Sequence, residues 1–387
     1  MHYSIYPTKD TWISSGSRKT DGKAFTEQNF GQDEILELKK NFYNLTFDYP
    51  TRVLVQFDLT SISQSINNGD IATPNTNANI GSEFYLRLYE GEGNKELSSN
   101  YEITAHAVSE SWDEGRGKFG SSPQVKDGAS WNYRKFPEGG SGITWTQSGS
   151  SYMSGSGEVA SQSFSSSKPD IEINVTDIVI PWLSGSGAPA GTQNLPQSSG
   201  STNNGFLLRF TGSQETDTET FGQLKFFSSN TNTIYSPKLE VRWDDHTASS
   251  GSNTGSLLQI TSSGLADNYI YQIGNRYEYK EDEKVKFRFG ARNRYIQKTF
   301  NTSVQEVSGS FIPEGSGSYS IVDIASGETK VPFSSYTSMS CDSTSPYFIH
   351  WLNGFETDRI YKILIKVKYD DGQEKIFDND FEFKIKR

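Results

Sequence analysis

One stretch, residues 51–62 with the sequence TRVLVQFDLTSI, limits the fold of this chain more than any other. Its residues alternate, so that Val53, Val55 and Phe57 lie on one side of an extended backbone and Arg52 and Leu54 lie on the other. A period of two belongs to the β-strand. Because the run is also short and rich in β-branched and aromatic residues, it predicts a half-buried strand rather than a helix.

The same alternation recurs along the chain and predicts an all-β protein. Aromatic residues make up 13% of the sequence while apolar residues make up only 33%, a balance typical of sheets with large loops. The 387 residues exceed what one compact sandwich holds, so two domains are expected. A single short helix is expected at residues 175–183, with Thr176 or Asp177 as its N-cap.

Changes in composition predict the domain boundaries. Residues 1–243 form a first, larger β domain, and residues 244–256, which contain DDHTASSGSNTG, form a polar Gly/Ser linker. Residues 257–387 carry Lys-rich alternating strands at 284–290, 361–369 and 381–386. Their apolar positions would line one core, which predicts an immunoglobulin-like β-sandwich.

Several short motifs of the first domain resemble those of the DNRLRE family, which is also grouped among carbohydrate-binding modules. They include DTWIS, NFG, FYLRLYEG, TAHAVSESWDEG, GFLLRF and the closing stretch FFSSNTNTIYSPKLEVRW. The resemblance covers residues 3–243, with insertions near 63–82, 115–160 and 184–204, and it implies a β-jelly-roll sandwich. Where the family has a charged stretch in the closing motif, this chain has Asn232, Thr233 and Ile234.

Charge and cysteine content exclude several classes of protein. The net charge of −11 argues against general nucleic-acid binding, which depends on excess Lys and Arg. A single cysteine, Cys341, excludes an internal disulfide. The first residues lack a basic segment followed by an apolar one, and no apolar run is long enough for a membrane span, so neither a signal peptide nor a span is expected.

Catalytic and metal motifs are weak in this sequence. Its four histidines are far apart, no HExxH pair or nucleophile elbow occurs, and no catalytic residue, cofactor site or metal site is predicted. The acidic residues around Trp112, namely Glu110, Asp113 and Glu114, could supply the two carboxylates of a glycosidase or could bind Ca²⁺. Asp244 and Asp245 could also bind Ca²⁺. A solvated turn is the favoured interpretation of that cluster.

Two groups of side chains remain as candidate binding residues. Exposed aromatic rings can stack on sugars, so a glycan platform is one interpretation of Trp112, Trp131, Tyr133 and Trp145, although rings that pin long loops look the same in sequence. The second group is a possible basic face for a complementary acidic partner, made of Lys284, Lys286, Arg288, Lys362, Lys366, Lys368, Lys384 and Lys386. Exposed lysines that prevent edge-to-edge strand pairing explain the second pattern equally well.

Repeated Gly-Ser pairs at residues 155–157, 185–187 and 315–317 resemble the composition of structural proteins from contractile-tailed phages of marine cyanobacteria. This resemblance implies a non-enzymatic virion protein of the tail, baseplate or neck. It would be made in the host cytoplasm and would contact other virion proteins in an oligomeric or symmetric assembly. The alternative is a carbohydrate- or host-surface-binding module. A polysaccharide-degrading enzyme and a capsid decoration protein rank lower.

Overall fold

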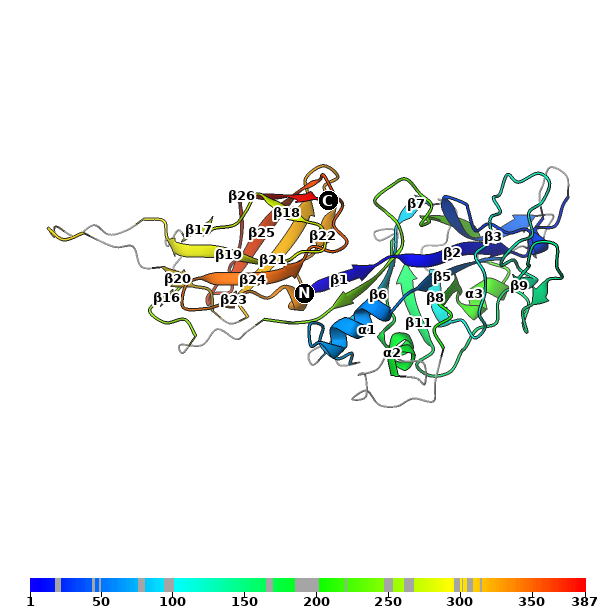
Figure 1. Ribbon diagram of the computed structural model, residues 1–387, viewed down its shortest axis with the longest axis horizontal. Helices are drawn as coiled ribbons and strands as arrows, with labels where there is room; N and C mark the ends of the chain where they lie inside the picture. The colour runs from blue at the N-terminus through cyan, green and yellow to red at the C-terminus, as the bar shows by residue number, and fades with distance from the viewer. Residues whose placement is uncertain are drawn as a thin grey trace. The chain divides into compact units, whose positions relative to one another are not determined.

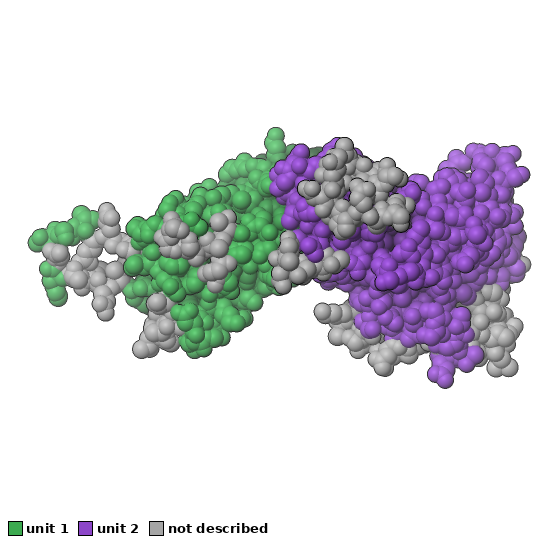
Figure 2. Space-filling view, turned by 90° about the horizontal axis from the view of Figure 1, so that it is seen from below, with its two compact units in different colours: residues 1–3, 242–387 green, residues 4–241 purple. Residues whose placement is uncertain are grey.

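The computed structural model describes residues 1–17, 22–43, 46–48, 50–75, 81–93, 101–164, 170–184, 202–219, 221–246, 253–260, 268–295, 300, 302–304, 309–313 and 315–387. The chain divides into two compact units, coloured separately in Figure 2. The N-terminal unit is Ser4–Val241, and the C-terminal unit combines Met1–Tyr3 with Arg242–Arg387. We expected residues 1–3 in the first domain. They belong to the second because the terminal amine of Met1 donates to the carbonyl oxygens of Trp243 and Tyr336. The predicted linker, 244–256, includes residues 247–252, which lie outside the described residues.

The strands of the N-terminal unit form a sandwich, and several of them are labelled in Figure 1. One sheet has the order β11 (Val159–Phe164), β8 (Tyr101–Ala107), β13 (Phe206–Phe210), β5 (Thr51–Phe57) and β2 (Pro7–Ser14). A second sheet has the order β1 (His2–Ile5), β15 (Lys238–Arg242), β6 (Glu83–Leu88) and β12 (Ile171–Asn174). A third sheet has the order β4 (Thr46–Asp48), β3 (Ile35–Tyr43), β14 (Gly222–Phe227) and β7 (Glu90–Gly93). Since only Tyr89 separates β6 from β7, one stretch of chain pairs in both short sheets. Strand β3 packs on β5 and β13 of the five-stranded sheet.

Strand β5 is buried on both faces, which corrects the prediction of a half-buried strand. Val53 and Val55 have no exposed surface, and neither has Leu54 on the opposite face. The alternation in the sequence is that of a strand with one solvent-exposed face, but another segment of the chain covers that face. The predicted range also ran too far, because β5 ends at Phe57.

The second layer comes from the long segment between β8 and β11, which includes the small hairpin β9 (Tyr133–Lys135) and β10 (Ile143–Thr144). Trp112, Ala129 and Trp145 from this segment pack with Ile13 and Leu54 of the five-stranded sheet in one buried cluster. Both indole N–H groups are satisfied, because Trp112 donates to the carbonyl of residue 204 and Trp145 to that of residue 130. Aromatic rings thus hold a segment poor in aliphatic residues.

A buried ion network lies beneath the same segment. The carboxylate of Glu215 accepts from Nε of Arg52 at 2.8 Å and from Nη2 of Arg52 at 2.9 Å, and it also accepts from Arg209. Arg52 donates to the carbonyl oxygen of Gly149 at 2.6 Å, and Arg209 donates to the hydroxyl of Tyr152. Two sheet residues therefore bind the covering segment at two points.

The described residues contain three α-helices where one was expected. The expected helix is present as α2 (Thr176–Ser184), whose first turn is held by the Asn174 side chain accepting from the backbone N–H of Thr176. Helix α1 (Thr60–Asn67) was missed because its start, Asp58-Leu-Thr-Ser, also reads as a strand end. Asp58 accepts from the Thr60 backbone at 2.9 Å. The remaining helical segments are α3 (Gly212–Thr216) and the 3₁₀ turns η1 (Phe25–Glu27) and η2 (Ser335–Thr337).

The C-terminal unit is a sandwich of two sheets. The first has the order β16 (Leu258–Gln259), β20 (Ser310–Phe311), β19 (Lys284–Asn293), β24 (Pro346–Trp351) and β23 (Ser340–Cys341), with β17 (Asn268–Gln272) also paired to β19. The second has the order β18 (Glu278–Lys280), β26 (Glu374–Lys386), β25 (Ile360–Lys368), β21 (Gly317–Asp323) and β22 (Thr329–Val331). Alternate residues of β19, β25 and β26 meet in one core, including Phe287, Ile365 and Phe383. The two sandwiches confirm the predicted fold class. Gly372, with φ +83°, lies in the turn between β25 and β26.

Candidate functional site

The turn formed by the NFG motif, residues 29–31, holds the loop after Trp112 against the rest of the N-terminal unit. The buried Asn29 side chain donates to the carbonyls of Glu114 at 2.6 Å and Ala129 at 2.8 Å. It accepts from the backbone N–H groups of Gly31 at 3.0 Å and Gly117 at 2.8 Å. A Cβ on Gly31 would lie 2.3 Å from the Glu114 carbonyl oxygen, so the contact requires glycine.

The same contact places Phe119 above Asp33. Asp33 accepts from the backbone N–H of Phe119 at 2.9 Å and from the indole N–H of Trp12 at 2.9 Å. Burial raises the pKa of the Asp33 carboxyl. The Phe119 ring is 46% exposed and is the outermost ring of a group whose inner members, Trp12 and Phe30, are stacked at 3.8 Å.

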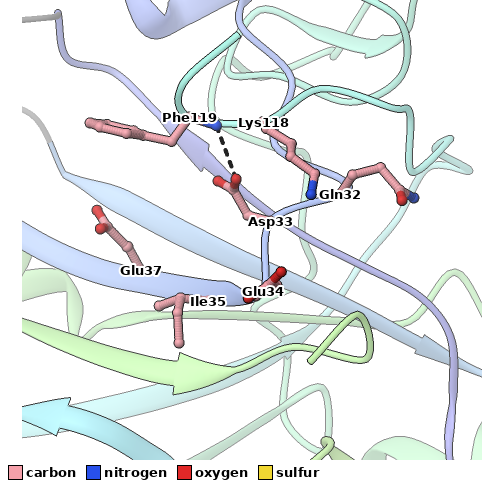
Figure 3. A pocket seen from close by; sticks show the side chains of 7 residues that line it. All are labelled: Gln32, Asp33, Glu34, Ile35, Glu37, Lys118 and Phe119. Atoms are coloured by element: carbon pink, nitrogen blue, oxygen red, sulfur yellow. Dashed lines mark hydrogen bonds between the residues drawn. The ribbon is translucent and has the colours of Figure 1, made fainter. Parts of the chain in front are cut away.

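A surface hollow of about 290 Å³ opens beside this ring, and it is lined by Gln32, Asp33, Glu34, Ile35, Glu37, Lys118 and Phe119. In the view of Figure 3, Phe119 and Glu37 lie on one side of the hollow, Lys118 and Gln32 lie on the other, and Asp33 lies between them. Glu37 pairs with Lys39, whose ammonium lies 5.9 Å from the centroid of the Phe119 ring. One exposed ring therefore borders a set of hydrogen-bond acceptors and donors.

Asp10 supports the site from inside the unit. Its carboxylate accepts from the backbone N–H of Ser229 at 2.6 Å and from the Ser229 hydroxyl at 2.9 Å. Next to Ser229, the hydroxyl of Ser228 donates to the Asp33 carbonyl at 2.6 Å. Glu114 lies beside Asp10 and accepts from its backbone N–H at 2.9 Å. Burial raises the pKa of both carboxyls, that of Asp10 to about 6.

We expect Asp10 to make the protein less stable as the pH rises from 4 to 7. Its pKa of about 6 in the folded state exceeds the ordinary value of 3.8, so folding favours the protonated form. The stability from this group is complete below pH 4 and is lost as pH rises through about 6, on the order of 3 kcal/mol in all. The Asp10→Asn variant should lose this pH dependence in urea unfolding at pH 4, 5, 6 and 7. The exposed Asp113→Asn is the control, and an unchanged slope in Asp10→Asn would contradict the assignment.

The structure corrects part of the predicted aromatic platform. Trp112 is 1% exposed and Trp145 is 4% exposed, so neither ring offers a face to a sugar. Trp131 is half-buried, with the Arg52 guanidinium 5.0 Å from its ring centroid. Tyr133 is half-buried as well and packs edge-on against Phe136 at 5.1 Å. The exposed ring of the hollow, Phe119, was not among the predicted residues.

The acidic residues around Trp112 point to different partners. Glu110 accepts from the backbone N–H of Thr146, Asp113 pairs with Lys135 at 3.2 Å, and Glu114 turns toward Asp10. Across the described residues, no three His, Cys, Asp or Glu side chains are grouped so that they could share a metal ion. His106 lies in β8 and contacts the carbonyl of Met153 at 3.0 Å. Cys341 is free and buried, and burial raises the pKa of its thiol to about 12.

The predicted basic face is not one surface. Lys284, Lys286 and Arg288 lie on β19, whereas the other five cations lie on β25 and β26 of the second sheet. Both sheets turn their apolar residues into the shared core, so the two sets of cations point away from each other. On the second sheet, four of the five are paired with carboxylates: Lys362 with Asp378, Lys366 with Glu374, Lys384 with Asp358 and Lys386 with Glu278.

Sequence signals for the hollow existed but were not read as a site. Gln32, Asp33 and Glu34, which directly follow the NFG motif, line the hollow together with Lys118 and Phe119. These two segments are far apart in the sequence, and long-range hydrogen bonds of Asn29, Gln32 and Asp33 to residues 114–119 bring them together. None of the described helices is long and apolar enough to cross a membrane.

Comparison with known proteins bears on the same region. A family model described as carbohydrate-binding module family 96 matches residues 2–132. No curated protein and no solved structure matches the chain. Residues 2–132, which contain every residue that lines the hollow, are therefore similar to a carbohydrate-binding module.

Proposed function

We propose that the N-terminal unit binds a glycan in the hollow beside Phe119. The observation that carries the proposal is the position of this hollow inside the segment that matches carbohydrate-binding module family 96. Modules of this kind bind sugars and do not cleave them, which agrees with the absence of a catalytic motif in the sequence. The proposed activity is binding alone.

The lining of the hollow suits a sugar ring. The exposed face of Phe119 can cover the C–H groups of a pyranose, and burial of that apolar contact provides affinity. The carboxylates of Asp33, Glu34 and Glu37 accept hydrogen bonds from hydroxyl groups, while Lys118 and Gln32 donate them. The volume of about 290 Å³ is at the small end of ligand sites.

Charge favours neutral sugars or amino sugars in this hollow over sugar acids. Its lining contains three carboxylates and one ammonium group. Residues 4–241 contain 18 of the 36 Lys and Arg residues of the chain and 27 of its 47 Asp and Glu residues. The N-terminal unit therefore has a formal charge of −9. A polymer of uronic acids would meet like charge here.

The Phe119→Ala variant tests the site. We expect its affinity for a bound neutral glycan to fall at least about tenfold, because the ring supplies the apolar contact. The measurement is a glycan array that contains neutral, amino-sugar and uronate chains, followed by calorimetry on the glycans that bind. Phe221→Ala, at another exposed ring of the same unit, is the matched control. If no neutral or amino-sugar glycan binds, or if Phe119→Ala binds as tightly as the natural protein, the site is wrong.

The wider role stays a prediction from composition. Membership of the DNRLRE type, a place in the tail, baseplate or neck of a phage virion and contacts with other virion proteins rest on the sequence resemblance. In that setting the hollow would contact host-surface polysaccharide. Mass spectrometry of purified phage particles tests this prediction, since a virion protein must be present in stoichiometric amounts.

A further inference from the structure

The outer face of the β17–β19–β24 sheet carries a regular arrangement of cations and aromatic rings. On β19 the outward residues include Lys286, Arg288 and Arg292, which alternate with the buried Phe287 and Phe289. Strand pairing sets Arg292 opposite Tyr269 of β17 and Arg288 opposite Tyr347 of β24. We call this surface the β19 face, defined by Lys286, Arg288, Arg292, Tyr269, Tyr271 and Tyr347.

The cations of the β19 face lie over its rings. The ammonium of Lys286 is 3.5 Å from the centroid of the Tyr347 ring, and the guanidinium of Arg292 is 5.1 Å from that of Tyr269. The rings of Tyr269 and Tyr271 stack at 6.0 Å. Tyr271 also lies across Gly290, where a Cβ would come within 2.2 Å of the ring. The glycine lets this ring lie flat against the sheet and keeps the surface level.

The β19 face keeps an excess of positive charge, unlike the opposite sheet. Within the part of the chain that the structure describes, Asp342 is the one carboxylate that pairs with cations of this face, and it pairs with two of the three, at 2.6 Å from Arg288 and 3.2 Å from Lys286. The hydrogen bond from Arg288 holds the pKa of Asp342 well below its usual range, so this carboxylate stays charged. On β25 and β26, by contrast, Lys362 and Lys384 each have a carboxylate of their own.

We propose that the β19 face binds an acidic polysaccharide, a sugar polymer that carries carboxylate groups. Arg292 can form paired hydrogen bonds with a sugar carboxylate, and flat tyrosine rings cover the C–H faces of sugars. A level row of such groups along one strand fits an extended chain. This proposal concerns the C-terminal unit and does not depend on the hollow near Phe119.

Affinity electrophoresis of the full chain through gels containing polygalacturonate, with dextran as the neutral polymer, tests the proposal. The natural protein should be retarded by polygalacturonate and not by dextran, and raising the salt from 50 to 300 mM should weaken the retardation. Lys286→Gln combined with Arg292→Gln should reduce affinity about tenfold. Tyr269→Ala should reduce it about threefold without changing charge. The matched control, Lys362→Gln with Lys384→Gln, removes the same charge from the other sheet and should change affinity less than twofold.

Four results would overturn the proposal. The first is an absence of retardation by polygalacturonate at 50 mM salt. The second is an equal loss in the control variant, which would show that net charge alone matters. The third is a loss in Phe119→Ala, which would place the acidic polymer in the hollow. The fourth is equal retardation by poly-glutamate, which would identify an acidic protein as the better ligand.

Discussion

Replacing Glu215 with glutamine is expected to lower the free energy of unfolding by about 3–5 kcal/mol. The substitution keeps the shape of the side chain but removes the negative charge shared by Arg52 and Arg209. All three residues are buried, so both guanidinium groups would remain in a dry environment without a counter-charge. Urea unfolding followed by tryptophan fluorescence measures the loss.

An exposed ion pair of the same unit is the control for this prediction. Lys225 and Glu92 lie 2.6 Å apart, but the Glu92 side chain is 69% exposed. Glu92→Gln should change stability by less than about 1 kcal/mol, since water screens such pairs. Hydrogen exchange should rise in residues 149–153 of Glu215→Gln, where Arg52 and Arg209 attach the covering segment. Loss of less than 1 kcal/mol in Glu215→Gln would show that the network does not hold the segment.

The Asn29→Ala variant is expected to lose about 4 kcal/mol of stability together with glycan binding. It leaves two backbone N–H groups and two carbonyls without their partner, and each buried unpaired group costs about 1–3 kcal/mol. Because these bonds position the loop that carries Phe119, the ring should no longer border the hollow. Unfolding experiments and calorimetry with a bound glycan measure the two effects.

Asn132→Ala is the matched control, because residue 132 is held through its backbone groups in the same long segment. It should bind glycan normally and unfold within about 1 kcal/mol of the natural protein. If Asn29→Ala is destabilised but still binds with normal affinity, the turn supports the fold without organising the site. Normal stability in Asn29→Ala would contradict the hydrogen-bond assignment itself.

The strands could be predicted from sequence because their alternation reflects a local constraint. A strand was predicted at residues 361–369, and β25 occupies Ile360–Lys368. Helix α1 was missed since the signal at its start, Asp58, serves a strand end equally well. Local patterns of this kind do not indicate which other segment of the chain packs on a given face of a strand.

The predicted site residues could bind a ligand only if their side chains were exposed to solvent. The alternation of residues along a strand does not predict that exposure. Trp112 and Phe119 are both aromatic residues of one loop, yet the first is buried under the covering segment and the second is open beside the hollow. The cations of β19 and β25 share one sequence pattern, but pairing places them on different sheets. Their carboxylate partners come from distant turns and decide which face keeps its charge.

The sequence by itself determined that this is an all-β chain with two sandwiches, because side-chain alternation and turn residues act over a few positions. The tertiary structure alone decided which ring, acid and cation is available to a ligand. Those properties arise where residues 29–33 meet residues 114–119, and where β17, β19 and β24 pair. Contacts between residues far apart in the chain leave no local period to read.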